Sequence, residues 1–237
     1  MTKLFLLYFL LTVLIVVKVK PFFCCRFIAA KPICKTYSNG AKEWFLNGEL
    51  HREDGPAIEY TSGTKKWLRN GRLHREDGPA AEYANGTKEW YLNGKLHRED
   101  GPAIEYFNGT KEWFLNGRRH RKDGPAVNRI NKYNKWYLNG KLHREDGPAI
   151  ERPNGTKHWF LNGELHREDG PAVEHSNGDK LWYLNGKRHR EDGPAYDGAD
   201  GHREWHLNGR LLSKEEWFEQ LTEEQQEKAL FDSGVMI

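Results

Sequence analysis

The sequence has few cysteines and almost no excess of either charge. Its three cysteines, Cys24, Cys25 and Cys34, lie near the N-terminus, so disulfide bonds do not hold the rest of the chain together. Lysine and arginine number 37 and aspartate and glutamate 34, a net charge of +3, which argues against a dedicated nucleic-acid surface. Hydrophobic residues make up only 37% of the chain, which excludes a membrane protein with many spans.

Motifs of common enzyme classes are also missing. The chain has no Gly-x-Ser-x-Gly elbow and no Walker-type phosphate loop, and no cysteine follows residue 34. We therefore expect no enzymatic activity, no catalytic residue and no cofactor.

A 23-residue repeat dominates the chain. Tryptophan recurs at this spacing eight times, at Trp44, Trp67, Trp90, Trp113, Trp136, Trp159, Trp182 and Trp205. Histidine recurs seven times, at His51, His74, His97, His120, His143, His166 and His189. The spacing never varies, so no repeat contains an insertion. The pattern predicts three segments: residues 1–35, a repeat array over residues 36–210, and residues 211–237.

Turn-forming residues divide each repeat. Asn93-Gly94 and Asn108-Gly109 are both expected to form type I′ turns, in which the two central residues have positive φ. Asp100-Gly101-Pro102 is a third break. The runs between these breaks are rich in aromatic and β-branched residues and too short for a typical helix. One repeat is therefore predicted to be a β-hairpin followed by an ordered loop, residues 116–123 in one copy.

A single hairpin is only marginally stable in water, so neighbouring repeats must pack together. Successive hairpins are expected to extend one antiparallel ladder, with tryptophans in rows that form the core and a rise of about 10 Å per repeat. The expected fold is mainly β: an elongated single-sheet array of stacked antiparallel β-hairpin repeats, with an N-terminal hydrophobic helix and a short C-terminal capping helix.

The stretch Asn108–Gly117 has the form Asn-Gly, three residues, Trp, an aromatic residue, Leu and Asn-Gly. Repeated every 23 residues, it resembles the MORN repeat, especially the MORN-like repeats of bacterial and large-virus proteins. The resemblance covers about residues 36–210. It departs after His97, where the usual unit soon has glycines but the first glycine here is Gly101. The resemblance implies a hairpin fold and a scaffolding, membrane-associated or antitoxin role, and it transfers no functional residue.

Residues 4–17 form an apolar run without a charge. As a helix this run spans about 21 Å, short of the ~30 Å hydrocarbon core. An uncleaved single-pass anchor is favoured, with residues 4–20 in the membrane and Lys18 reaching its interface. A cleaved secretory signal and an apolar segment docked on the array are the alternatives.

Three basic residues between positions 18 and 26 follow the apolar run, which favours a cytosolic C-terminal body. Cys24 and Cys25 are then candidates for S-palmitoylation, and the alternative is that they are ordinary apolar thiols. The opposite topology predicts glycosylation at the sequons of Asn85, Asn108 and Asn154, although a turn already explains each of these residues.

The last segment changes from turns to helix signals. Ser213 and Glu216 form a capping box before Trp217 and Leu221, and Thr222 with Gln225 repeats it, which indicates one kinked helix or two short ones. We expect this segment to cap the last hairpin. The alternative is a partner-binding helix that uses Trp217, Leu221 and Leu230.

The stretch His-Arg-Glu-Asp-Gly-Pro is the strongest candidate for a site. His97 and Asp100 are metal-binding residue types, but one repeat supplies two ligands and structural zinc takes four, so no metal site is predicted. The aspartate is expected to bond its own turn, with the arginine and glutamate in solvent. Acidic residues in every repeat offset the basic ones, so nucleic-acid binding is not expected. The predicted partner-facing loop contains His51, His74, His97, His120, His143, His166 and His189.

Together these features predict a non-enzymatic, membrane-tethered scaffold that presents a long face to an unidentified protein or to lipid headgroups. The alternative is a soluble or secreted, antitoxin-like partner-binding protein whose N-terminal stretch is cleaved or packed.

Overall fold

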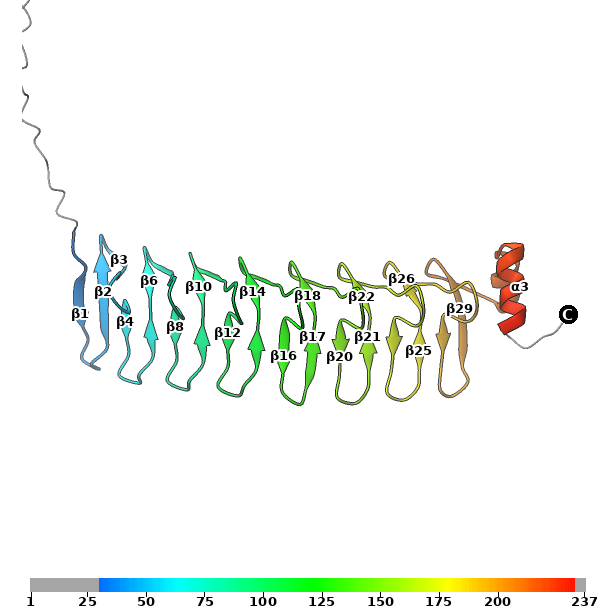
Figure 1. Cartoon of the computed structure of the whole chain (residues 1–237), viewed down its shortest axis with the longest axis horizontal. Coiled ribbons are helices and arrows are strands. Elements are labelled where there is room, and N and C mark those ends of the chain that lie inside the picture. The colour runs from blue at the N-terminus through cyan, green and yellow to red at the C-terminus, as the bar shows by residue number, and fades with distance from the viewer. Residues whose placement is uncertain (1–29, 233–237) are drawn as a thin grey trace, which may run out of the picture. The chain divides into compact units, whose positions relative to one another are not determined.

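The computed structural model describes residues 30–232, with side chains through residue 230. Internal contacts divide the chain into residues 1–31 and 32–237, and the second unit is the one described below. This unit is mainly β, as predicted, with an antiparallel sheet of 18 strands followed by two short helices (Figure 1). The expected N-terminal hydrophobic helix lies outside the described residues.

Successive repeats contribute pairs of strands to the long sheet, and each strand pairs with its predecessor and its successor. The turns between them lie along one edge, as Figure 1 shows. In spatial order the strands are β1 (Ile33–Thr36), β2 (Lys42–Leu46), β4 (Ile58–Glu59), β5 (Lys65–Lys66), β8 (Ala81–Glu82), β9 (Lys88–Glu89), β12 (Ile104–Glu105), β13 (Lys111–Glu112), β16 (Val127–Arg129), β17 (Tyr133–Lys135), β20 (Ile150–Glu151), β21 (Lys157–His158), β24 (Val173–Glu174), β25 (Lys180–Leu181), β28 (Tyr196–Asp197), β29 (Arg203–Leu207) and β30 (Arg210–Leu212), while β3 (Glu49–Leu50) also pairs with β2.

Each interior repeat contains a second, shorter hairpin, whose turn and second strand the sequence analysis assigned to an ordered loop. That assignment, and with it the expectation of one single sheet, is incomplete, because six two-stranded ladders stand apart from the long sheet. They are β6 (Leu68–Arg69) with β7 (Arg72–Leu73), β10 (Tyr91–Leu92) with β11 (Lys95–Leu96), β14 (Phe114–Leu115) with β15 (Arg118–Arg119), β18 (Tyr137–Leu138) with β19 (Lys141–Leu142), β22 (Phe160–Leu161) with β23 (Glu164–Leu165), and β26 (Tyr183–Leu184) with β27 (Lys187–Arg188).

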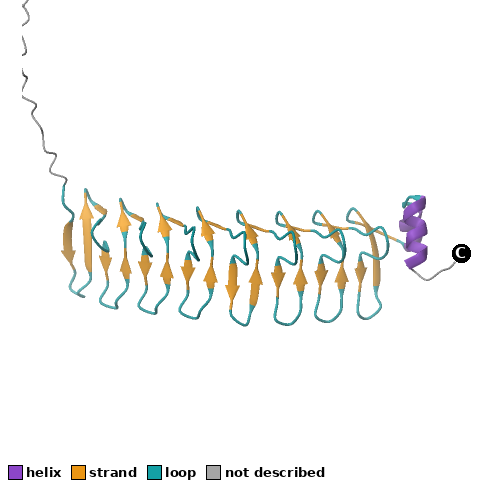
Figure 2. Ribbon diagram, in the orientation of Figure 1, coloured by secondary structure: helices purple, strands orange, loops and turns teal. Residues whose placement is uncertain are grey.

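Figure 2 shows the short hairpin strands beside the strands of the long sheet, and main-chain bonds of the repeat tryptophan join the two hairpins of a repeat. The main-chain N–H of Trp90 donates to the carbonyl of Ala103 at 2.8 Å, and its carbonyl accepts the N–H of His97 at 3.0 Å. The first bond continues the pairing of β9 with β12 in the long sheet, and the second continues the pairing of β10 with β11 in the short hairpin. Both main-chain groups of Trp90 are thus satisfied although the strand is interrupted there.

The two Asn-Gly turns of a repeat differ. Asn93 and Gly94 have φ of 52° and 77°, so the predicted type I′ turn is confirmed. The same prediction is wrong for Asn108-Gly109, where only Gly109 has positive φ, at 80°. There the side-chain oxygen of Asn108 accepts the N–H of Thr110 at 3.0 Å, and the loop is one residue longer than a two-residue turn allows.

The most deeply buried residues are small and β-branched ones, whereas the repeat tryptophans are only partly buried. The prediction that rows of tryptophan form the core is therefore wrong, because alanines and β-branched residues form it and the repeat tryptophans lie at its border. Seven alanines each stand directly before a strand of the long sheet and have no exposed surface, which leaves room for the close packing of neighbouring repeats. They are Ala57, Ala80, Ala103, Ala126, Ala149, Ala172 and Ala195.

Two helices, α2 (Lys214–Glu219) and α3 (Glu223–Asp232), follow the last strand. Ser213 and Glu216 form the predicted capping box. Trp217 is 3% exposed, and its indole N–H donates to the carbonyl of Arg190 at 2.9 Å. Leu221 is also buried, in a cluster that Trp205 of the last repeat joins. The helices therefore pack on the last repeat, as a cap does, and Trp217 and Leu221 are not free to bind a partner.

Candidate functional site

In each of the seven His-Arg-Glu/Lys-Asp-Gly-Pro loops the guanidinium of the arginine lies over the ring of the repeat tryptophan. The guanidinium carbon of Arg98 lies 4.2 Å from the centre of the Trp90 ring, within range of a cation–π interaction. The other six copies show the same contact, at 3.9–4.2 Å. A Cβ at Gly101 would approach the same guanidinium carbon to 2.8 Å, so glycine is needed there to admit the arginine.

The polar atoms of the arginine close the loop. Arg98 donates from Nε to Asp100 at 2.9 Å, and from one terminal nitrogen to the carbonyl of Pro102 at 3.3 Å and to Glu105 at 3.2 Å. The prediction that this arginine is in solvent is wrong, because a ring covers one face and three acceptors surround its edge. The hydrogen bond and the charge of Arg98 hold the pKa of Asp100 below its usual value.

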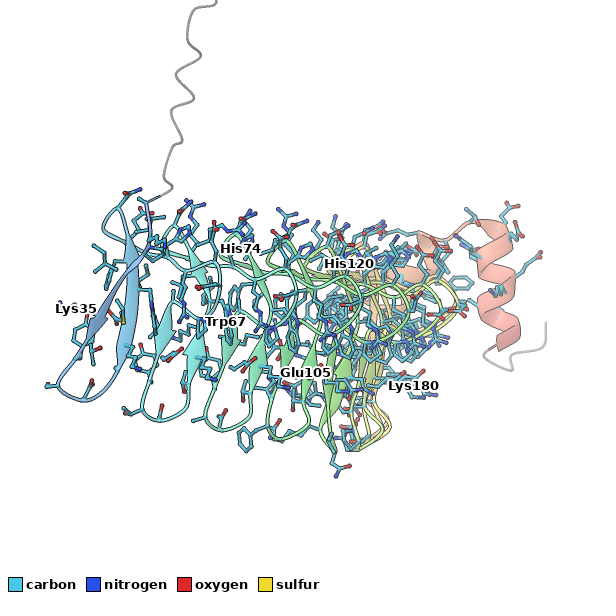
Figure 3. The ribbon with its side chains drawn as sticks, turned by 60° about the vertical axis from the view of Figure 1, so that its left-hand side comes forward. Lys35, Trp67, His74, Glu105, His120 and Lys180 are labelled. Carbon is cyan, nitrogen blue, oxygen red and sulfur yellow. The ribbon has the colours of Figure 1, made fainter. Side chains whose placement is uncertain are left out.

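The repeat histidines connect neighbouring repeats. Nδ1 of His74 accepts the main-chain N–H of Asn93 at 3.1 Å, and Asn93 begins the hairpin turn of the next repeat. The same N–H···Nδ1 bond is present at all seven repeat histidines. His74 and His120, labelled in Figure 3, illustrate the position. The predicted partner-facing histidines thus have one ring nitrogen directed at the adjoining repeat.

The acidic residues of the loops form the exposed part of this surface, which we call the acidic loop row. The glutamates Glu53, Glu76, Glu99, Glu145, Glu168 and Glu191 are all exposed, and Lys122 occupies the equivalent position in the fourth copy. The side chain of Glu99 is 84% exposed, whereas that of Arg98 is 23% exposed. Six of the seven loops therefore turn the arginine inward and the glutamate outward, which makes the row negative except at the fourth copy, where Lys122 is exposed.

Hollows separate successive loops. Three of them, in the C-terminal half of the array, have volumes of about 730, 780 and 670 Å³. In the middle one, Trp159, Leu161 and His166 lie between the loop that carries Glu145 and the loop that carries Glu168. Each of these hollows thus has an apolar floor of one tryptophan and one leucine between two successive loops, and the arrangement recurs every 23 residues.

A different set of side chains breaks the repeat near the middle of the array. The hydroxyl of Tyr83 donates to Glu89 at 3.0 Å, and Tyr37, two repeats earlier, makes the equivalent bond to a glutamate at 2.6 Å. Burial, and then Glu89, raise the pKa of Tyr83 to about 12. The position equivalent to Tyr83 holds Arg129 two repeats later and Arg152 three repeats later. Sequence reasoning missed this change, which appears when the repeats are aligned on their tryptophans.

Two arginines flank one buried carboxylate. Glu112 is 2% exposed and accepts two hydrogen bonds from Arg119, at 3.0 and 3.1 Å, while Arg129 lies 3.7 Å away on its other oxygen. Lys135 is half-buried and pairs with Ile150 of β20, and the exposed Arg152 follows that strand. Among the side chains that the structure describes, no carboxylate is within 4.0 Å of the charged nitrogens of either.

Other predicted features are outside the site or outside the described region. Cys24, Cys25 and residues 4–20 lie outside the described residues. Within residues 30–232, no helix is long and apolar enough to cross a membrane. Over the same residues, no group of three or more His, Cys, Asp or Glu side chains is arranged to hold a metal ion.

No protein-family model matches the sequence, and no curated protein is significantly similar to it.

Proposed function

We propose that the chain is a non-enzymatic scaffold of MORN-like repeats that binds a basic segment of a partner protein along the acidic loop row. The observation that carries the proposal is the inward arginine and outward carboxylates of the same loop, repeated at a fixed spacing. Binding energy at such a row comes from steering by charge and from contact with the tryptophan and leucine of each hollow. The regular spacing suits an extended segment that contacts several repeats at once.

The proposal includes a tether. The apolar run of residues 4–20 is proposed to anchor the chain in a membrane by a single pass, with the array in the cytosol. The alternative, a soluble or secreted binder with an antitoxin-like role, uses the same acidic loop row. Carbonate extraction of membranes from cells that express the full chain separates the two. Release only by detergent, at full length, supports the anchor, and release by carbonate contradicts it.

The binding surface is tested with a defined basic probe, poly-lysine, and the full-length chain in detergent. In the variant Glu145→Lys/Glu168→Lys two glutamates of the row become lysines, a change that the fold accepts at Lys122. The control, Glu215→Lys/Glu219→Lys, makes the same change of net charge at exposed positions of α2. Binding at moderate salt should weaken about tenfold or more in the first variant and less than about twofold in the control. Equal weakening in both variants would contradict a specific row.

A further inference from the structure

A hollow of about 520 Å³ lies between the turn that joins β16 to β17 and the turn that follows β20. Lys132, Tyr133, Lys135, Arg152 and Pro153 are among the residues that line it. They come from one hairpin and from the start of the next turn, because β17 pairs with β20 in the register Lys135↔Ile150. We call this feature the cationic hollow.

The cations of the hollow gather around one ring. The ammonium nitrogen of Lys135 is 4.7 Å, and the guanidinium carbon of Arg129 is 5.0 Å, from the centre of the Tyr133 ring. The ring attracts both cations, but it cannot neutralise them. Among the described side chains, Glu112 is the negative charge that acts on Lys135, and Arg119 and Arg129 already pair with it. Arg119, Arg129, Lys135 and Arg152 carry four formal positive charges against that one negative charge, an excess of three.

Two properties of neighbouring groups agree with this excess. Burial, and then the charges of Arg119 and Arg129, lower the pKa of Lys135. Further along the same face, Nε2 of His158 is buried without a hydrogen-bond partner, and burial followed by the charge of Arg152 lowers the pKa of this histidine. Like charges crowded on a partly buried face are unfavourable unless an anion compensates them.

We propose that the cationic hollow binds a phosphate monoester group. A phosphate dianion offers several acceptor oxygens, which suits the planar fork of Arg152 and the ammonium groups of Lys132 and Lys135 on one wall. The open hollow leaves room for the group that carries the phosphate, with Tyr133 and Pro153 as its apolar contacts. The site shares no residue with the acidic loop row, so this inference and the proposed function stand or fall separately.

Calorimetric titration of the full-length chain with inorganic phosphate, at constant ionic strength, tests the site. Saturable binding is expected, and Arg152→Gln and Lys135→Gln should each weaken it about tenfold. The matched control is Lys180→Gln, which removes an exposed lysine from the outward face of β25. It should change the affinity less than about twofold. Melting temperatures of all variants show that the fold is retained.

The proposal is overturned if phosphate does not saturate the parent chain, or if Lys180→Gln weakens binding as much as Arg152→Gln. A double variant, Lys135→Gln/Arg152→Gln, that binds phosphate as the parent does would also overturn it.

The source of the phosphate is resolved with vesicles of phosphatidylcholine with and without phosphatidic acid. A gain in binding on phosphatidic acid that Arg152→Gln removes assigns the site to a lipid headgroup. Equal binding to both vesicles assigns it to a soluble phosphate ester.

Discussion

The guanidinium of Arg98 is enclosed between the ring of Trp90 and the main chain of Gly101, and it is bonded to Asp100 at its edge. The arrangement orders a loop that contains no regular secondary structure. Because the interaction joins residues eight positions apart, it forms only when the short hairpin has closed. The repeats thus depend on a side-chain contact as well as on their main-chain ladders.

Replacement of Arg98 by alanine should lower the free energy of unfolding by about 1–3 kcal/mol, since a cation–π contact and hydrogen bonds to two carboxylates are lost. Arg98→Lys should recover only part of the loss, because an ammonium cannot reach all the acceptors of the planar fork. Denaturant unfolding measures both values. Arg72→Ala, at an exposed hairpin position, is the control and should cost less than about 0.5 kcal/mol. Equal losses at Arg98 and Arg72 would contradict the role given to the loop.

Replacement of the asparagine by glycine should affect stability differently in the two Asn-Gly turns. Asn93 has positive φ, so Asn93→Gly removes strain and should leave stability within about 0.5 kcal/mol, whereas Asn93→Ala should cost about 1 kcal/mol. Asn108 lacks positive φ and acts through its side chain, so Asn108→Gly and Asn108→Ala should both cost about 1 kcal/mol. Thermal melts of the four variants check the contrast, and a tolerated Asn108→Gly would show that its side-chain bond contributes little.

Acid should destabilise the array. Hydrogen bonds and then charge from the loop arginines lower the pKa of Asp54, Asp77, Asp100, Asp146 and Asp169. A lowered folded-state pKa contributes stability that is present above the unfolded value, about 3.9, and is lost as the pH falls through the folded value. The melting temperature should therefore be insensitive to these groups near neutral pH and decrease below about pH 4.

The acid response of these aspartates can be isolated by substitution. Asp77→Asn and Asp100→Asn remove the titrating groups and should flatten the dependence of melting temperature on acidic pH, in proportion to the number of loops altered. Asp123→Asn is the matched control, since Arg121 bonds the carbonyl of Pro125 but not Asp123, in contrast to the bond of Arg98 to Asp100. An equal flattening by the control would show that another group dominates the acid response.

Loss of the C-terminal cap should expose the last repeat. Trp217→Ala removes a buried ring and should cost about 3–5 kcal/mol, and Trp217→Phe should cost about 1 kcal/mol because it loses the bond to the Arg190 carbonyl. Sedimentation velocity should show association of Trp217→Ala chains that increases with concentration. Glu219→Ala, an exposed change in the same helix, should leave both stability and association unchanged.

The period, the β-hairpins, the turn at Asn93-Gly94 and the capping box at Ser213 were predictable, because each depends on neighbouring residues in the sequence. The short hairpins were not, because the chain leaves the long sheet at the repeat tryptophan, where no turn-forming residue marks the break. The contact of Arg98 with Trp90 and the cationic hollow depend on how turns close and how equivalent positions align across repeats. Counting charges along the chain cannot reveal either.

Main-chain bonds between β9, β12 and β13 connect one repeat to the next, and the same connection recurs through the long sheet. Tension applied to the two ends of the sheet would be carried by these connections in series, so every interface would bear the full load. The weakest one would yield first, and each complete release would add 23 residues, about 80 Å of extended chain. The array is therefore built as a row of equal mechanical links, and a stretched molecule should lengthen in steps of nearly constant size.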